Sequence, residues 1–155
     1  MVLAIDPGSE KSAYAVIKRI NLEVVAIGMD ENKNILSFIK DFSRGADVRI
    51  EMIASYGMAV GASVFDTCVW IGRFTQVSLD SDSNSVATVF RKDVKMHLCG
   101  NPRAKDANIR QAIIDNYERM YGGGVTKKGG MLYKASKDIW AAIGVGMTAI
   151  DRERV

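Results

Sequence analysis

The N-terminal part of the chain alternates short apolar runs with turns, and this order restricts the fold more than any other feature. Val2-Leu3-Ala4-Ile5 runs into Asp6-Pro7-Gly8-Ser9, which predicts a buried strand that ends in a turn. Apolar segments at 12–17 and 22–28 follow at hairpin distance. We therefore expect three antiparallel strands at the start of the fold, with Asp6 at the C-terminal end of the first.

The hydrophobic period then changes to that of a helix over residues 32–43 and returns to a strand over 48–54, which contains Glu51. A strand at 86–90 and helices at 91–98, 105–120 and 136–150 complete the expected elements. Neither a repeat nor a linker divides the sequence. Residues 1–155 are therefore predicted to form a single α/β domain.

The segment 57–74 has apolar residues almost all round a helix, among them Met58, Val64, Cys68 and Trp70. Such a helix must be buried. The pattern leaves two partners open, the core of the same subunit or a second subunit.

Composition excludes several classes of protein. With 155 residues, 48% of them hydrophobic and 25% charged, the chain is typical of one globular domain with a full-sized core. No apolar stretch approaches the roughly eighteen residues of a membrane span, and no charged leader is present, so we expect a cytoplasmic protein without a membrane partner. Two cysteines, Cys68 and Cys99, and a single histidine, His97, provide neither zinc-type spacing nor a disulfide framework.

The positive charge is concentrated in one region. Residues 1–90 carry eight basic and eleven acidic side chains, whereas residues 91–137 carry eleven basic and four acidic ones. A basic region of this kind suits a polyanion, because each neutralised phosphate releases counterions. The alternative is a solvated face that only aids solubility.

Three acids need an explanation. Asp6 and Glu51 lie on strands expected to be adjacent, and two buried carboxylates would repel each other unless a cation lay between them. Asp138, in the first turn of the last helix, could approach the same point and complete an all-oxygen site suited to Mg²⁺, with Mn²⁺ as a substitute. Taken singly, Asp6 could be a turn residue, Glu51 could be neutralised by a nearby Lys or Arg, and Asp138 could only favour the helix dipole.

These residues resemble the RuvC-type Holliday junction resolvases of the ribonuclease H-like superfamily. The resemblance is carried by Ile5-Asp6-Pro7-Gly8, by Ile50-Glu51 before a long apolar helix, and by an acid at the last helix. It extends to Asp93-Val94-Lys95, a turn at Gly100, and Arg103-Ala104-Lys105. The family fold is a mixed α/β sheet, three antiparallel strands followed by parallel ones, flanked by helices.

The chain departs from the family at one position. Two acids three residues apart are common at the start of the family's final helix, whereas here Asp138 is followed at that spacing by Ala141. Either Asp138 alone completes the site or another group assists it. The short length resembles a bacteriophage version of the enzyme, which would act in the cytoplasm of a bacterial host.

The resemblance implies a Mg²⁺-dependent endonuclease that cuts branched DNA, four-way junctions above all, in recombination and repair. Asp6, Glu51 and Asp138 would hold the metal, Lys105 would act beside them, and the 57–74 helix would form a homodimer. The DNA-binding candidates are Lys95, Arg103, Lys105, Lys127, Lys128, Lys134 and Lys137.

Three rival interpretations remain. A non-catalytic junction-binding protein would use the acids for structure alone. A related nuclease would act on linear, flap or RNA-containing substrates. A sugar-kinase-like or actin-like ATPase also begins with a strand and an Asp-x-Gly turn, but it needs two such domains and a second phosphate-binding loop, for which 155 residues are too few.

Overall fold

A computed structural model describes residues 1–57 and 59–154, in which five strands form one sheet in the order β3-β2-β1-β4-β5. β1 pairs antiparallel with β2 and parallel with β4, while β2–β3 is antiparallel and β4–β5 parallel. The expected mixed sheet, three antiparallel strands followed by parallel ones, is confirmed. The strands are β1 (Val2–Asp6), β2 (Lys11–Ile17), β3 (Val24–Glu31), β4 (Asp47–Met52) and β5 (Ser85–Phe90).

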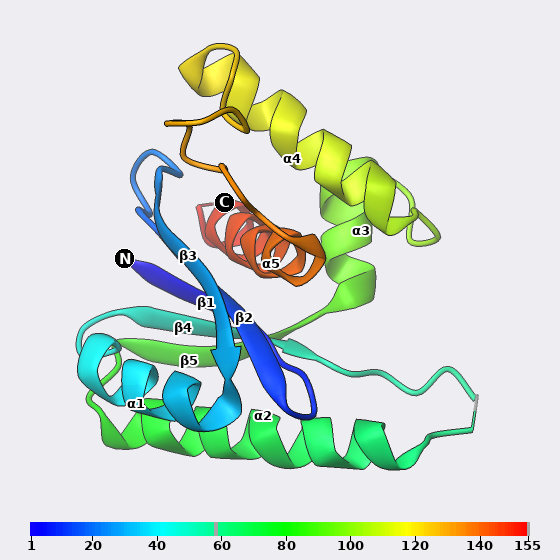
Figure 1. Cartoon of the computed structure of the whole chain (residues 1–155). Coiled ribbons are helices and arrows are strands. Elements are labelled where there is room, and N and C mark those ends of the chain that lie inside the picture. Colours follow the sequence, from blue (N-terminus) through cyan, green and yellow to red (C-terminus); the bar gives the residue numbers. More distant parts are fainter. Residues whose placement is uncertain (58, 155) are drawn as a thin grey trace.

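Helices cover both faces of this sheet (Figure 1). On one face α1 and α2 enclose a core with Leu3, Ile5 and Ile50, and on the other α3, α4 and α5 enclose a core with Val2 and Ala4. Successive residues of β1 thus point into opposite layers, as strand geometry requires. The helices are α1 (Asn32–Phe42), α2 (Ala62–Asp80), α3 (Arg91–Cys99), α4 (Asp106–Tyr121) and α5 (Lys137–Glu153).

The last helix, α5, packs very closely on the sheet. Residues 139–150 of this helix are all buried. A Cβ atom added at Gly146 would lie 2.6 Å from Ile17 Cδ1 and 3.1 Å from Ala4 Cβ. The missing side chain therefore lets the helix backbone approach β1 and β2.

The expected 57–74 helix is displaced along the chain. Gly57 adopts φ +77°, a left-handed conformation that interrupts a helix, and α2 begins only after Gly61. The helix then continues to Asp80, because Thr67, Ile71, Phe74 and Ser78 form a buried stripe at helical spacing. Met58 lies outside the described residues.

The other face of α2 is exposed in the single chain. Phe65 and Val69 expose 62% and 61% of their surface, and Cys68 is exposed as well. Of the two partners that the sequence left open, the core of the same subunit therefore covers only one face of this helix. Burial against a second subunit stays a prediction.

Residues 122–130, which connect α4 to α5, form a series of turns. Gly122, Gly124 and Gly129 have positive φ angles, and the Leu132 amide donates to the Val125 carbonyl at 2.9 Å. Val125 and Leu132 are buried in the core beside α4 and α5.

Within the described residues, no helix is long and apolar enough to cross a bilayer.

Candidate metal and nucleic-acid site

Asp6 and Glu51 lie side by side at the carboxyl end of the sheet. Ile5 of β1 is in register with Ile50 of the parallel strand β4, so the next residue on each strand is an acid. Both acids share the α5 side of the sheet, because Ala4 packs against that layer and Arg49 binds Glu153 of α5. The predicted proximity of the two strand ends is confirmed.

Asp138 approaches this end because of the direction of α5. The C-terminal end of the helix reaches the amino end of β4, where Glu153 Oε1 lies 2.6 Å from Arg49 Nη2. Its N-terminal turn, which carries Asp138, must therefore lie toward the carboxyl ends of β1 and β4. The charge of Asp138 accordingly contributes to raising the pKa of Asp6.

The electrostatics of the site are unfavourable for ionised carboxylates. Burial, followed by the negative charge of Glu51, raises the pKa of Asp6 to about 8. Burial also raises the pKa of Glu51, against the opposing effect of Arg91. Strongly perturbed carboxylates grouped at one edge of a sheet are typical of functional sites.

Two residues that the sequence did not identify join this group. Arg91, the first residue of α3, donates from Nη1 to Glu51 Oε2 at 3.1 Å and from Nη2 to Asp106 Oδ1 at 2.7 Å. The hydrogen bond from Arg91 lowers the pKa of Asp106. The sequence left open that a nearby Lys or Arg neutralises Glu51, and in this structure Arg91 does so.

No local signal would have revealed this bridge. Arg91 is 40 residues from Glu51 and 15 from Asp106. Only the placement of Asp106 in the first turn of a helix, next to Lys105 of the family-like motif, marks it as a candidate.

The donor chemistry fits a hard divalent cation, since Asp6, Glu51 and Asp138 offer only carboxylate oxygens. Their arrangement does not yet form a cage. In the part of the chain that the structure describes, no three His, Cys, Asp or Glu side chains are grouped so that they could hold a metal ion. The metal ligands therefore stay a prediction.

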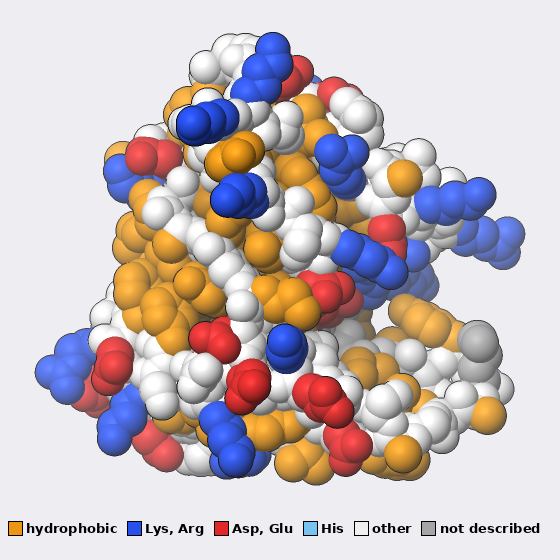
Figure 2. Space-filling view, viewed as in Figure 1, with side chains coloured by type: hydrophobic (Ala, Val, Ile, Leu, Met, Phe, Trp, Pro, Cys, Tyr) orange, Lys and Arg blue, Asp and Glu red, His pale blue; other side chains and the backbone are white. Residues whose placement is uncertain are grey.

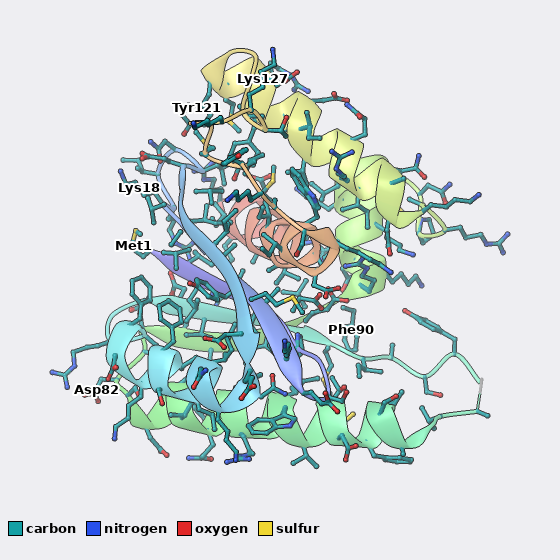
Figure 3. The ribbon with its side chains drawn as sticks, viewed as in Figure 1. Met1, Lys18, Asp82, Phe90, Tyr121 and Lys127 are labelled. Carbon is teal, nitrogen blue, oxygen red and sulfur yellow. The ribbon has the colours of Figure 1, made fainter. Side chains whose placement is uncertain are left out.

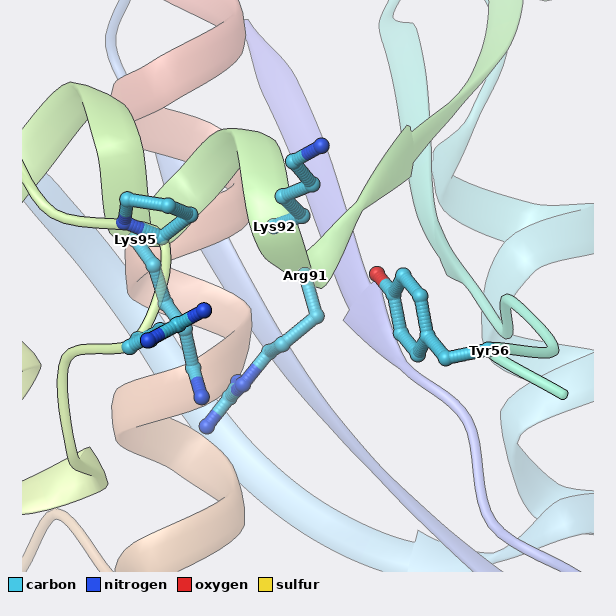
Figure 4. A pocket seen from close by; sticks show the side chains of 6 residues that line it. Tyr56, Arg91, Lys92 and Lys95 are labelled. Carbon is cyan, nitrogen blue, oxygen red and sulfur yellow. The ribbon is translucent and has the colours of Figure 1, made fainter. Parts of the chain in front are cut away.

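A basic groove adjoins the acids. It has a volume of about 590 Å³ and is lined by Tyr56, Arg91, Lys92, Lys95, Pro102 and Arg103. Figure 4 shows Tyr56 on one side and α3 with Lys92 and Lys95 on the other, while the Arg91 guanidinium points away from Tyr56. Figure 2 shows Lys and Arg side chains gathered over this part of the molecule, beside a recess. The structure thus brings Lys95 and Arg103 together at one groove.

Lys137 lines a second recess, of about 340 Å³, together with Asp106, Arg110 and Trp140. Its charge contributes to lowering the pKa of Asp106, although Arg91 has the larger effect. Lys105 immediately precedes α4 and is exposed, and its backbone N–H donates to Asn108 Oδ1 at 2.9 Å. These two lysines therefore belong to the surroundings of Asp106.

The remaining predicted DNA-binding lysines, Lys127, Lys128 and Lys134, lie on the connection between α4 and α5. α4 has 16 residues, so its length of about 24 Å separates the start of this connection from Asp106. Figure 3 shows Lys127 near Tyr121, at the C-terminal end of α4, and Phe90 where α3 begins. Lys127 and Lys128 are therefore not part of the groove around Arg91.

The strand order, and the helices on both faces, define a ribonuclease H-like fold of the RuvC type. The structure of RuvC from Thermus thermophilus matches with a TM-score of 0.69 and 13% identity, over 99% of this chain and 95% of that one. A T. thermophilus RuvC in complex with a Holliday junction substrate matches with a TM-score of 0.69 and 11% identity, over 99% and 94%. No family model matches the sequence, and comparison with curated proteins gives no match. The RuvC-like fold expected from the motifs is confirmed.

Proposed function

We propose that the chain is a metal-dependent endonuclease that cleaves branched DNA, with four-way junctions as its principal substrate. The observation that carries this proposal is the crowding of carboxylates at the carboxyl end of β1 and β4, beside a basic groove, in a RuvC-like fold. The similar Thermus protein was solved with a Holliday junction, which supports the choice of substrate.

Asp6, Glu51 and Asp138 would hold Mg²⁺, for which Mn²⁺ would substitute. When bound, the metal would activate a water molecule and stabilise the leaving oxygen of the phosphodiester. Lys95 and Arg103 would hold backbone phosphates in the groove, and Lys105 would provide positive charge near the reacting phosphate. Lys137 would extend this surface, while Lys127, Lys128 and Lys134 would contact DNA farther from the cut.

A dimer would match the symmetry of the substrate. A four-way junction has two-fold symmetry, so two sites related by a two-fold axis would cut opposed strands. The exposed face of α2, with Phe65, Cys68 and Val69, supports this helix as the interface, because neighbouring exposed apolar side chains are typical of contact surfaces. Val69→Glu is expected to yield a monomer in sedimentation analysis, and an unchanged mass would exclude this interface.

The decisive experiment compares Asp6→Asn with wild type on a four-way junction, a flap and a duplex, each with Mg²⁺ and with chelator. We expect the variant to lose cleavage by about 10³-fold or more while junction binding is retained or tightened, because a negative charge beside DNA is removed. Asp41→Asn, on the exposed side of α1, is the matched control and should cut normally.

A non-catalytic junction-binding protein is the second candidate, favoured by the ion pair that already occupies Glu51. It predicts binding without cleavage under every condition. If cleavage occurs on the flap or duplex but not on the junction, a related nuclease is the better assignment. Joint loss of binding and cleavage in a folded Asp6→Asn variant would contradict the role of Asp6.

A further inference from the structure

Arg91 contacts Glu51, one of the three acids expected to hold a cation. Its guanidinium spans Glu51 and Asp106, with N–O distances of 3.1 and 2.7 Å, and the side chain exposes only 26% of its surface. Glu51 is more enclosed, at 14%. A charge-assisted pair in such surroundings is less screened than a pair in open solvent.

The charges around Arg91 explain why it is needed there. Asp6, Glu51 and Asp106 repel one another, and the charge of Arg91 opposes the rise in the pKa of both Asp6 and Glu51. Among the described residues, Arg91 is the basic side chain in direct contact with this group. Without it or another cation, the carboxyl end of the sheet would contain several uncompensated carboxylates.

We propose that Arg91 is a built-in counter-ion that competes with the divalent cation for Glu51, and so sets the cation concentration at which the site becomes loaded. The proposal rests on the proposed function, because it assumes that Glu51 is a cation ligand. Glu51 Oε2 accepts from Arg91, so a divalent cation that binds this oxygen must weaken or displace that contact. Asp106 retains the second nitrogen of the guanidinium and keeps the displaced arginine at the wall of the groove.

Arg91 acts here as a positioning residue, and a readout on the protein without DNA tests it. The experiment titrates MnCl₂ into wild type, Arg91→Gln and Lys92→Gln by calorimetry, at one pH and ionic strength. Lys92 is the charge-matched control, since it lines the same groove one residue away. We expect Arg91→Gln to bind Mn²⁺ about fivefold or more tightly than wild type, and Lys92→Gln to stay within about twofold of it.

Arg91→Lys is a second variant that keeps the positive charge, in case Arg91→Gln does not fold. Circular dichroism shows whether each variant is folded. Lysine keeps the charge but lacks the planar fork that spans two carboxylates. We expect its Mn²⁺ affinity to fall between those of wild type and Arg91→Gln. A merely structural role for Arg91 would lower the stability of both variants without tightening cation binding.

The outcomes separate the two proposals. If wild type cleaves junctions and binds Mn²⁺, but Arg91→Gln binds it no more tightly than Lys92→Gln, the counter-ion proposal is overturned and the nuclease proposal stands. If neither wild type nor Arg91→Gln binds Mn²⁺ and no cleavage occurs, both are overturned. The counter-ion role is supported if Arg91→Gln binds Mn²⁺ more tightly than wild type while Lys92→Gln does not. The folded Arg91→Lys variant should then have a Mn²⁺ affinity between those of wild type and Arg91→Gln.

Discussion

The two ends of the same pair of strands hold carboxylates and arginines in opposite balance. At the amino end of β4, Asp47 accepts from Arg19 Nη2, Asn84 Nδ2 and Ser85 Oγ, each at 2.6 Å. Burial alone would raise the pKa of Asp47, but these hydrogen bonds together with the charge of Arg19 lower it to about 2. At the carboxyl end, burial and the charge of Glu51 raise the pKa of Asp6 to about 8.

The number of partners accounts for the difference. At the amino end two arginines, Arg19 and Arg49, form ion pairs with two acids, Asp47 and Glu153. The charges in this group therefore balance. At the carboxyl end Arg91 alone is in direct contact with an excess of carboxylates, counting only the described residues. One end stabilises the fold, and the other stores electrostatic repulsion that a ligand can relieve.

The largest effect is expected from Asp47→Asn, which leaves Arg19 without its enclosed partner. Because Arg19 is partly exposed and keeps Glu153, the free energy of unfolding should fall by about 3 kcal/mol, measured by urea denaturation at pH 7 and fixed protein concentration. The pKa of Asp47 is lower folded than unfolded, so its stabilisation is present above pH 4 and is lost as the pH falls through about 2. The deficit of the variant should shrink over that window, and a constant deficit would contradict this account.

Asp6→Asn should have the opposite sign, because it removes repulsion. In chelator at pH 8, we expect the free energy of unfolding to rise by about 2–3 kcal/mol, less than the full pKa shift would give, since the site can relax. The pKa of Asp6 is higher folded than unfolded, so wild type loses stability as the pH rises from about 4 to about 8. The advantage of Asn should therefore vanish near pH 4. Equal stability of Asp6→Asn and wild type at pH 8 would contradict the storage of repulsion at the carboxyl end, and a loss of stability would mean that the two ends are alike.

Glu153→Gln tests how far the balance at the amino end is shared. Glu153 accepts from Arg19 Nη2 at 2.7 Å and from Arg49 Nε at 2.8 Å, but its side chain is 35% exposed. We expect a loss of about 1–2 kcal/mol by urea denaturation, smaller than for Asp47. A loss as large as that of Asp47→Asn would show that the four charges act as one unit.

Asp82→Asn provides the lower limit of the comparison. Arg44 and Asp82 are 3.9 Å apart, with side chains 82% and 79% exposed. Removing this pair should change the free energy of unfolding by less than about 0.5 kcal/mol under the same conditions. A larger change would indicate that ion-pair effects in this protein do not follow burial.

The sequence predicted the sheet well because its signals are local. The apolar periods of 2–6 and 11–17 and the turn at Pro7-Gly8 are enough to place Asp6 at a strand end. The start of α2 could not be predicted in the same way, because residues 57–61 are as apolar as the helix that follows and only the backbone of Gly57 separates them.

The candidate site was predictable only in part. Asp6 and Glu51 could be placed together from the strand order, since neighbouring parallel strands end at one edge. The bridge from Arg91 to Glu51 and Asp106 depends on how α3 and α4 pack, which no spacing in the sequence reveals. Ion pairs between distant segments form only when the tertiary structure brings those segments together.

The bare backbone at Gly146 governs more than local packing. It lies eight residues from Asp138, about 12 Å along α5, and its closeness to Ala4 and Ile17 fixes how deeply the helix sits. A larger residue at position 146 would push α5 away from β1 and β2. Asp138 would then lie farther from Asp6, although none of the acids had been changed. The position of Asp138 relative to Asp6 thus depends on the absence of a side chain at Gly146, more than two helical turns away.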